Sequence, residues 1–134
     1  MSESEAATGA SAPSHSFDEA TAHAQLDSAT REIAEVPAVE VIVEVAVNLM
    51  SAAAVKCGLA DEDGRESMQD LDEARKLINA LAGLITAGAP EISDSHARPL
   101  RDGLRSLQLA FREASPFPDE IGKGPGEKWT GPVT

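Results

Sequence analysis

Tyrosine is absent from this sequence of 134 residues, and only four aromatic side chains are present: Phe17, Phe111, Phe117 and Trp129. Basic residues are also scarce, because 11 Lys and Arg stand against 23 Asp and Glu and give a formal net charge of -12. Nucleic-acid binding depends on clustered Lys and Arg for the phosphates and on aromatic rings for base stacking. The composition therefore argues against a nucleic-acid-binding protein.

Cysteine occurs once, at Cys57, which excludes an intramolecular disulfide and leaves no cysteine partner for a zinc cluster. Its position after Lys56 allows a thiol activated by the neighbouring cation, but we favour a small apolar residue near a helix end. The histidines His15, His23 and His96 lack the spacing of metal ligands. No nucleophile, base and orienting residue come together either, so we expect no catalytic site. Taken with the single cysteine and the scattered histidines, this leads us to expect a cytoplasmic protein with no metal and no cofactor.

Long apolar runs are limited to one, over residues 39–55, which only four residues interrupt: Glu40, Glu44, Asn48 and Ser51. A membrane span needs about 20 apolar residues, and charged side chains are costly within the bilayer. The amino terminus has no early basic residue followed by an apolar core. We therefore expect neither a secretory signal nor contact with a membrane.

The polar residues of this run recur every three to four positions, which predicts a helix with a thin polar seam and an otherwise apolar circumference. Pro37 suits its first turn and Gly58 its end. A strand pair over residues 39–47 is the alternative, because valine favours strands, but the following MSAAA is strongly helix-forming. A helix this apolar must be covered nearly all round, so we expect self-association through Val39, Ile42, Val43, Val47 and Met50.

Two further main helices are predicted downstream. The first opens at Asp70, three residues before Glu73 as in a capping box, and ends at Gly88. Its apolar residues recur at helical spacing: Leu71, Ala74, Leu77, Ile78, Leu81, Leu84 and Ile85. The next helix begins between Ser93 and Pro99, and its apolar stripe is formed by Leu100, Leu104, Leu107 and Phe111.

The two ends of the chain lack such patterns. Residues 1–25 hold almost no large apolar side chains, which predicts a disordered acidic tail, and residues 26–36 could add a short helix. Residues 115–134 contain four prolines and four glycines, which predicts a flexible tail. The predicted fold is therefore all-α: a helical domain over residues 26–114, built as a small antiparallel bundle of three main helices between disordered N- and C-terminal tails.

Two groups of residues are candidate binding surfaces. Four arginines of the last main helix share one side, and we call them the arginine row: Arg98, Arg101, Arg105 and Arg112. We favour a solvated side paired with carboxylates, and an anionic partner such as RNA backbone is the alternative. In the last segment, a short linear motif could be formed by Lys123, Lys128 and Trp129. The surrounding GKGPGEK lacks the Gly-Lys-Ser/Thr ending and the flanking strand of a phosphate-binding loop.

Three segments, in this order, resemble one known family: the apolar helix that ends in AAA, then DLDEARKLINALAGLI, then PLRDGLRSLQLAFRE. Over residues 36–113 they are similar to the bacterial domain of unknown function 1844 family (DUF1844). Actinobacterial members also look similar in the GKGPGEKWTGPV segment. The resemblance implies a small all-helical fold and no catalytic residues. Those members often look like neighbours of a translation initiation factor gene, which suggests a link with translation.

These observations lead us to expect a non-enzymatic adaptor that forms homo-oligomers, with nucleic acid as a partner only through the ribosome. The alternative is a translation- or ribosome-associated factor that uses the arginine row.

Overall fold

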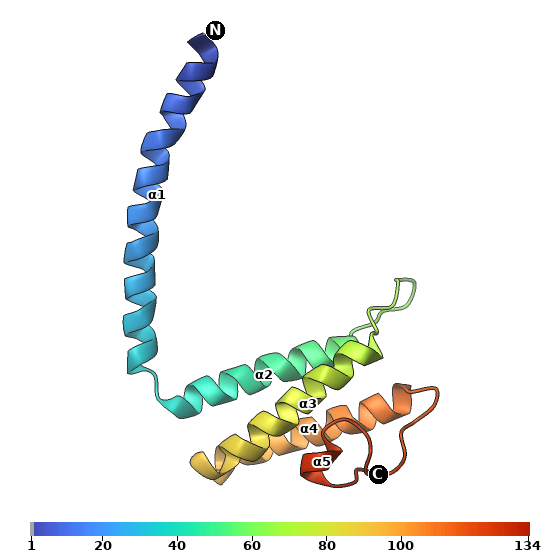
Figure 1. Ribbon diagram of the computed structural model, residues 1–134. Coiled ribbons are helices and arrows are strands. Elements are labelled where there is room, and N and C mark those ends of the chain that lie inside the picture. Colours follow the sequence, from blue (N-terminus) through green and yellow to red (C-terminus); the bar gives the residue numbers. More distant parts are fainter. Residues whose placement is uncertain (1) are drawn as a thin grey trace. The chain divides into compact units, whose positions relative to one another are not determined.

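The computed structural model describes the backbone of residues 2–134 and the side chains from residue 18 onward. Over these residues it contains helices and no strand, which confirms the predicted all-α class. The elements are α1 (Ser2–Glu35), α2 (Ala38–Lys56), α3 (Leu71–Gly88), a 3-10 turn η1 (Ala89–Glu91), α4 (Asp94–Ala114) and α5 (Glu127–Thr130) (Figure 1). The chain divides into two compact units, Met1–Pro37 and Ala38–Thr134.

The first unit is the long helix α1, where the sequence predicted a disordered tail followed by a short helix. From Asp18 to Glu35 almost every side chain of α1 is exposed, including Leu26 at 64% and Ile33 at 66%. Helices gain most of their stability in proteins by packing an apolar face, and this part of α1 buries none. That residues 1–25 lack stable structure in solution therefore stays a prediction.

The apolar helix of the second unit forms as predicted. Pro37 directly precedes α2, where its fixed φ and missing N–H suit a helix start. The helix ends at Lys56, and Gly58 follows in the left-handed region with φ 91°. The Gly58 N–H donates to the carbonyl oxygen of Val55 at 3.0 Å and so satisfies one of the last carbonyls of the helix.

Helix α3 begins where its capping residue predicts. Asp70 has extended backbone angles, and its carboxylate accepts a hydrogen bond from the Glu73 N–H at 3.2 Å. The backbone N–H of Asp70 donates to the carbonyl oxygen of Lys56 at 2.8 Å, which ties the start of α3 to the end of α2. Four of the seven predicted apolar residues of α3 are buried, namely Ala74, Ile78, Leu81 and Ile85. Leu71, Leu77 and Leu84 are partly buried against the core, and Ala82 and Gly88 are buried in addition to the prediction.

Helix α4 starts at Asp94, inside the predicted interval, and buries the whole predicted stripe of Leu100, Leu104, Leu107 and Phe111. The three helices α2, α3 and α4 run alternately in opposite directions, as the colour order in Figure 1 shows. Their shared core has Ile78 and Leu81 as its largest fully buried side chains. The predicted antiparallel bundle of three main helices is therefore confirmed.

Small residues let α2 come close to both neighbours. A Cβ atom added to Gly88 of α3 would lie 3.4 Å from the Cγ2 atom of Ile42. A Cβ atom at Gly103 of α4 would overlap the sulfur atom of Met50. Met50 thus occupies the space that a side chain at residue 103 would enter, whereas Ile42 lies at ordinary contact distance from Gly88.

The capping bond of α3 gives the first testable prediction. Replacing Asp70 by alanine removes the acceptor for the Glu73 N–H, and we expect the free energy of unfolding to fall by about 1 kcal/mol. Urea denaturation followed by circular dichroism measures this change. Asp63→Ala, in the exposed loop before α3, is the control and should leave stability almost unchanged. Equal stabilities of the two variants would show that the cap contributes nothing.

Candidate interaction surfaces

One side of α2 is left uncovered by the rest of the unit. Only Ala46 and Ala53 of its 19 residues are buried. Val41, Val45 and Val47 keep 44%, 43% and 44% of their surface exposed. We call the uncovered side the outward face of α2, and its exposed residues are Val41, Glu44, Val45, Asn48, Ser51 and Ala52, with Val47 at its edge.

The residues that the sequence predicted for self-association divide between the two sides of α2. Val43 and Met50 pack against the core of the same chain, and Ile42 lies over Gly88. Val39 is half-buried, and of the five only Val47 is exposed. The periodicity of α2 locates its polar seam but cannot show which part of a nearly continuous apolar surface meets α3 and α4. For that reason the predicted set does not include the exposed Val41 and Val45.

The outward face carries a regular seven-residue pattern. Val41, Val45, Asn48 and Ala52 of this face, followed by the half-buried Val55, are spaced at steps of four, three, four and three. This is the spacing of the contact positions in a coiled coil, where two helices interlock along one seam. The seam holds small or β-branched residues with one amide at Asn48.

Helix α2 is also long and apolar enough to cross a membrane by length and composition. That property is weak evidence, because the core helices of soluble proteins share it. Ala46 and Ala53 are buried within the bundle, and the outward face carries Glu44 and Asn48. Side chains of this kind are costly within lipid.

The arginine row lies on α4, and its first two members share one carboxylate. Arg98 Nη2 lies 2.7 Å from Asp94 Oδ2, and Arg101 Nη1 lies 3.5 Å from Asp94 Oδ1. All three side chains are more than half exposed, so each pair contributes little to stability.

The other two arginines of the row bind the carboxyl-terminal segment. Arg105 Nη2 donates to the terminal oxygen of Thr134 at 3.2 Å, and Arg112 Nη1 donates to the carbonyl oxygen of Asp119 at 3.0 Å. Each arginine of the row therefore has an acceptor within the chain. These contacts favour the interpretation of a paired, solvated side and give no separate support to RNA binding.

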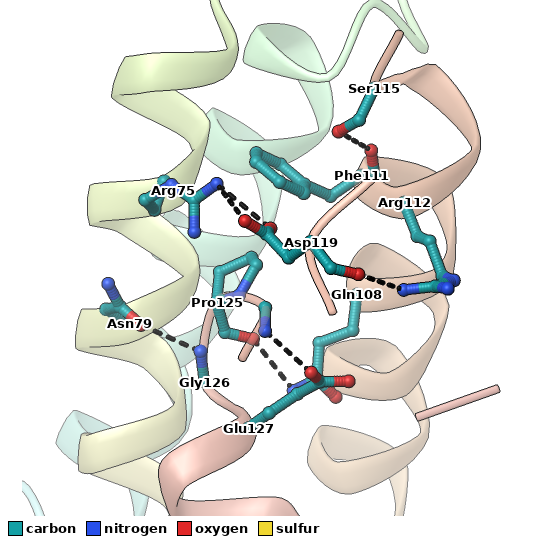
Figure 2. Close-up of polar contacts among 11 residues, drawn as sticks. Arg75, Asn79, Gln108, Phe111, Arg112, Ser115, Asp119, Pro125, Gly126 and Glu127 are labelled. Atoms are coloured by element: carbon teal, nitrogen blue, oxygen red, sulfur yellow. Dashed lines mark hydrogen bonds and ion pairs between the residues drawn. The ribbon is translucent and has the colours of Figure 1, made fainter. Parts of the chain in front are cut away.

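The segment after α4 packs on the bundle, where the sequence predicted a flexible tail. The Gly126 N–H donates to Asn79 Oδ1 of α3 at 2.7 Å (Figure 2). Gln108 of α4 is buried, and its Nε2 atom donates to the carbonyl oxygen of Pro125 and to Thr130 Oγ1, both at 3.1 Å. The segment is therefore held from two helices at once.

A second set of contacts fixes the beginning of the segment. Arg75 of α3 forms an ion pair with Asp119 at 3.0 Å, as Figure 2 shows. The guanidinium of Arg75 also lies 5.0 Å from the centre of the Phe111 ring, within the range of a cation–π contact. Because Arg112 binds the backbone of the same Asp119, this residue is held by both α3 and α4.

Glu127 organises the glycine-rich part of the segment. Its side chain is 7% exposed, and its two oxygens accept hydrogen bonds from the Gly124 N–H at 2.7 Å and the Val133 N–H at 2.8 Å. A phosphate-binding loop would offer such N–H groups to a ligand. Here an internal carboxylate occupies one N–H group of GKGPGEK, that of Gly124, and Asn79 Oδ1 occupies that of Gly126.

The residues of the predicted linear motif are partly used inside the chain. Trp129 of α5 lies over Gly83 of α3, where an added Cβ atom would come within 3.6 Å of the indole ring. The ammonium of Lys128 is 4.7 Å from the ring centre of Trp129, and Lys123 is exposed. Trp129 is 41% exposed, so the motif presents only part of its aromatic surface to solvent.

Cys57 and the described histidines show no sign of reactive or metal chemistry. Cys57 is 3% exposed, and burial raises the pKa of its thiol, which favours the protonated, unreactive form. His96 Nδ1 shares a hydrogen bond of 2.8 Å with Ser93 Oγ at the start of α4. The described residues include no group of three or more His, Cys, Asp or Glu that could hold a metal ion. His15 lies outside the residues whose side chains are described.

The docking of the carboxyl-terminal segment gives the second prediction. Gly126 has φ 76°, and a Cβ atom there would lie 2.9 Å from both the Ala82 Cβ and the Gln108 Nε2 atoms. Gly126→Ala should therefore release the segment, which we expect to accelerate tryptic cleavage after Lys128 at least about tenfold.

Gly131→Ala is the matched control, since Gly131 has a similar φ of 82° but open space around its Cα atom. Its ψ of 178°, against -12° at Gly126, lies in a region nearly exclusive to glycine, so this control carries at least as much backbone strain as Gly126→Ala but lacks the steric overlap. Equal cleavage rates in the two variants would contradict docking at Gly126.

Comparison with known families places the bundle in a defined group. The family described as "Domain of unknown function (DUF1844)" matches residues 38–113, which run from the start of α2 almost to the end of α4. The comparisons with curated proteins and with solved structures gave no match. Because the matched residues make up more than half of the chain, the protein belongs to the DUF1844 family.

Proposed function

We propose that this protein is a non-enzymatic helical interaction module that forms homo-oligomers, in the first instance dimers, through the outward face of α2. The observation that carries the proposal is the exposure of Val41 and Val45, at 44% and 43%, on a seam with heptad spacing. In a symmetric dimer the two copies contribute the same surface, so both copies of each of these side chains become buried in the interface.

The driving force is the removal of apolar surface from water. Such burial contributes about 25 cal/mol per Å² of apolar area, and an α-helix of 19 residues offers a contact line roughly 28 Å long. Ala52 lies on the seam between larger residues and lets the backbones approach closely. The apolar seam and the small side chain of Ala52 together support close packing of α2 against α2 of a second copy.

Asn48 supports a second copy of the chain as the occupant of this face. A single asparagine on a coiled-coil seam sets the register of the pair, because its amide can bond to a polar group of the partner helix. A lipid surface would offer no such partner to Asn48 or to the neighbouring Glu44. The polar residues of the face thus favour a protein partner with a matching seam.

The proposal predicts the response of the oligomer to a charge on the seam. Val45→Asp would bury a carboxylate in the interface from each copy, and we expect the dimer dissociation constant to rise about 100-fold or more. Sedimentation velocity over a range of protein concentrations measures the shift.

Leu109→Asp is the control for this experiment. Leu109 is a large apolar residue of α4 with 37% of its surface exposed, and it lies outside α2. The control should dimerise like the unaltered chain. An unaltered chain that sediments as a monomer at every concentration, or a Val45→Asp variant that dimerises normally, would refute the proposed interface.

A further inference from the structure

A pocket of about 400 Å³ lies between α3, α4 and the carboxyl-terminal segment. Its size falls in the range of small-molecule sites. Ile85 and Leu104 form part of its wall on the bundle side, and Pro132 and Val133 contribute from the segment. Ile85, Leu104 and Val133 are each at most 5% exposed, so this part of the wall is buried.

The polar part of the lining carries positive charge alone. Arg101 and Arg105 are one helical turn apart on α4 and both line the pocket, while no Asp or Glu among the described side chains does. This is notable in a chain with a net charge of -12. The pocket therefore combines an apolar wall with two neighbouring guanidinium groups.

Both guanidinium groups can bind an additional anion. The contact of Arg101 with Asp94 is long, at 3.5 Å, and both partners are more than half exposed. Arg105 is exposed and donates one N–H to the terminal oxygen of Thr134, the last residue, at 3.2 Å, and this contact leaves other N–H groups of its guanidinium for a ligand. Guanidinium groups bind carboxylate or phosphate oxygens more strongly than neutral acceptors, because the hydrogen bonds are charge-assisted.

We propose that this pocket binds a small amphipathic oxyanion, whose carboxylate or phosphate group is held by Arg101 and Arg105 and whose apolar part lies against Ile85, Leu104 and Val133. The pocket also limits the shape of the ligand. One face of the Trp129 ring carries Lys128 and the ring lies against Gly83, so part of its aromatic surface is occupied within the chain. An aliphatic body fits this wall better than a stacked base.

The carboxyl-terminal segment is a structural part of this pocket. Its wall residues Trp129, Pro132 and Val133 are held in place by the hydrogen bond of Glu127 to the Val133 N–H and by that of Gln108 to Thr130. Binding therefore requires the docked segment and is independent of self-association through α2.

Trp129 is the only tryptophan of the chain and lines the pocket, so its fluorescence reports occupancy. We would titrate the full chain with octanoate, octyl phosphate and the uncharged octanamide. The proposal predicts a saturable fluorescence change with at least one of the two anions, at an affinity at least about tenfold above that for octanamide. The stronger of the two anions identifies the preferred head group.

Arg101→Gln combined with Arg105→Gln removes both charges and should weaken anion binding at least about tenfold. Arg101→Gln alone, at an exposed side chain, is the milder variant and should give a smaller loss in the same direction. Arg98→Gln is the matched control, because Arg98 belongs to the same row but does not line the pocket. It should bind like the unaltered chain.

Three results would overturn the proposal. The first is the absence of saturation by either anion at millimolar concentrations. The second is equal binding of octanamide, which would show that the apolar wall alone accounts for affinity. The third is an equal loss of binding in the Arg98→Gln control, which would assign the effect to the general charge of α4.

Discussion

The burial of α2 by only two other main helices is the constraint on which the rest of this structure depends. An apolar helix of 19 residues can be covered on one side by α3 and α4, and Gly103 of α4 leaves the space that Met50 of α2 fills. The opposite side then stays open, with Val41 and Val45 exposed. The same property that forms the core of the bundle therefore also creates its proposed interface.

A second constraint is the need of one buried polar side chain for hydrogen-bond partners. Gln108 lies on the buried side of α4 between Leu104 and Phe111, where an amide without partners would be costly. The carboxyl-terminal segment supplies these partners through Pro125 and Thr130, and Glu127 in turn fixes the backbone of the segment. Satisfying this buried amide places the segment next to Arg101 and Arg105, and so completes the wall of the pocket.

Sequence patterns predicted those features that depend on neighbouring residues. Asp70 and Gly58 mark helix ends through local hydrogen bonds, and the apolar spacing of α4 predicts its buried side. The docked segment was missed because its many glycines and prolines exclude long helices and strands but not order. Its contacts, such as that of Asn79 with Gly126, join residues far apart in the chain. The one local signal was Gln108, a polar residue on an apolar stripe, which indicates a polar partner from elsewhere.

A cysteine cross-linking scan along α2 tests most directly the claim that this helix serves two interfaces. In a Cys57→Ser background, single cysteines would replace Val41, Val45, Asn48 and Ala52 in turn, with Leu109→Cys on α4 as the exposed control. The account predicts intermolecular disulfides at several of the four seam positions and almost none at the control. Equal cross-linking at the control, or none at any seam position, would contradict the account.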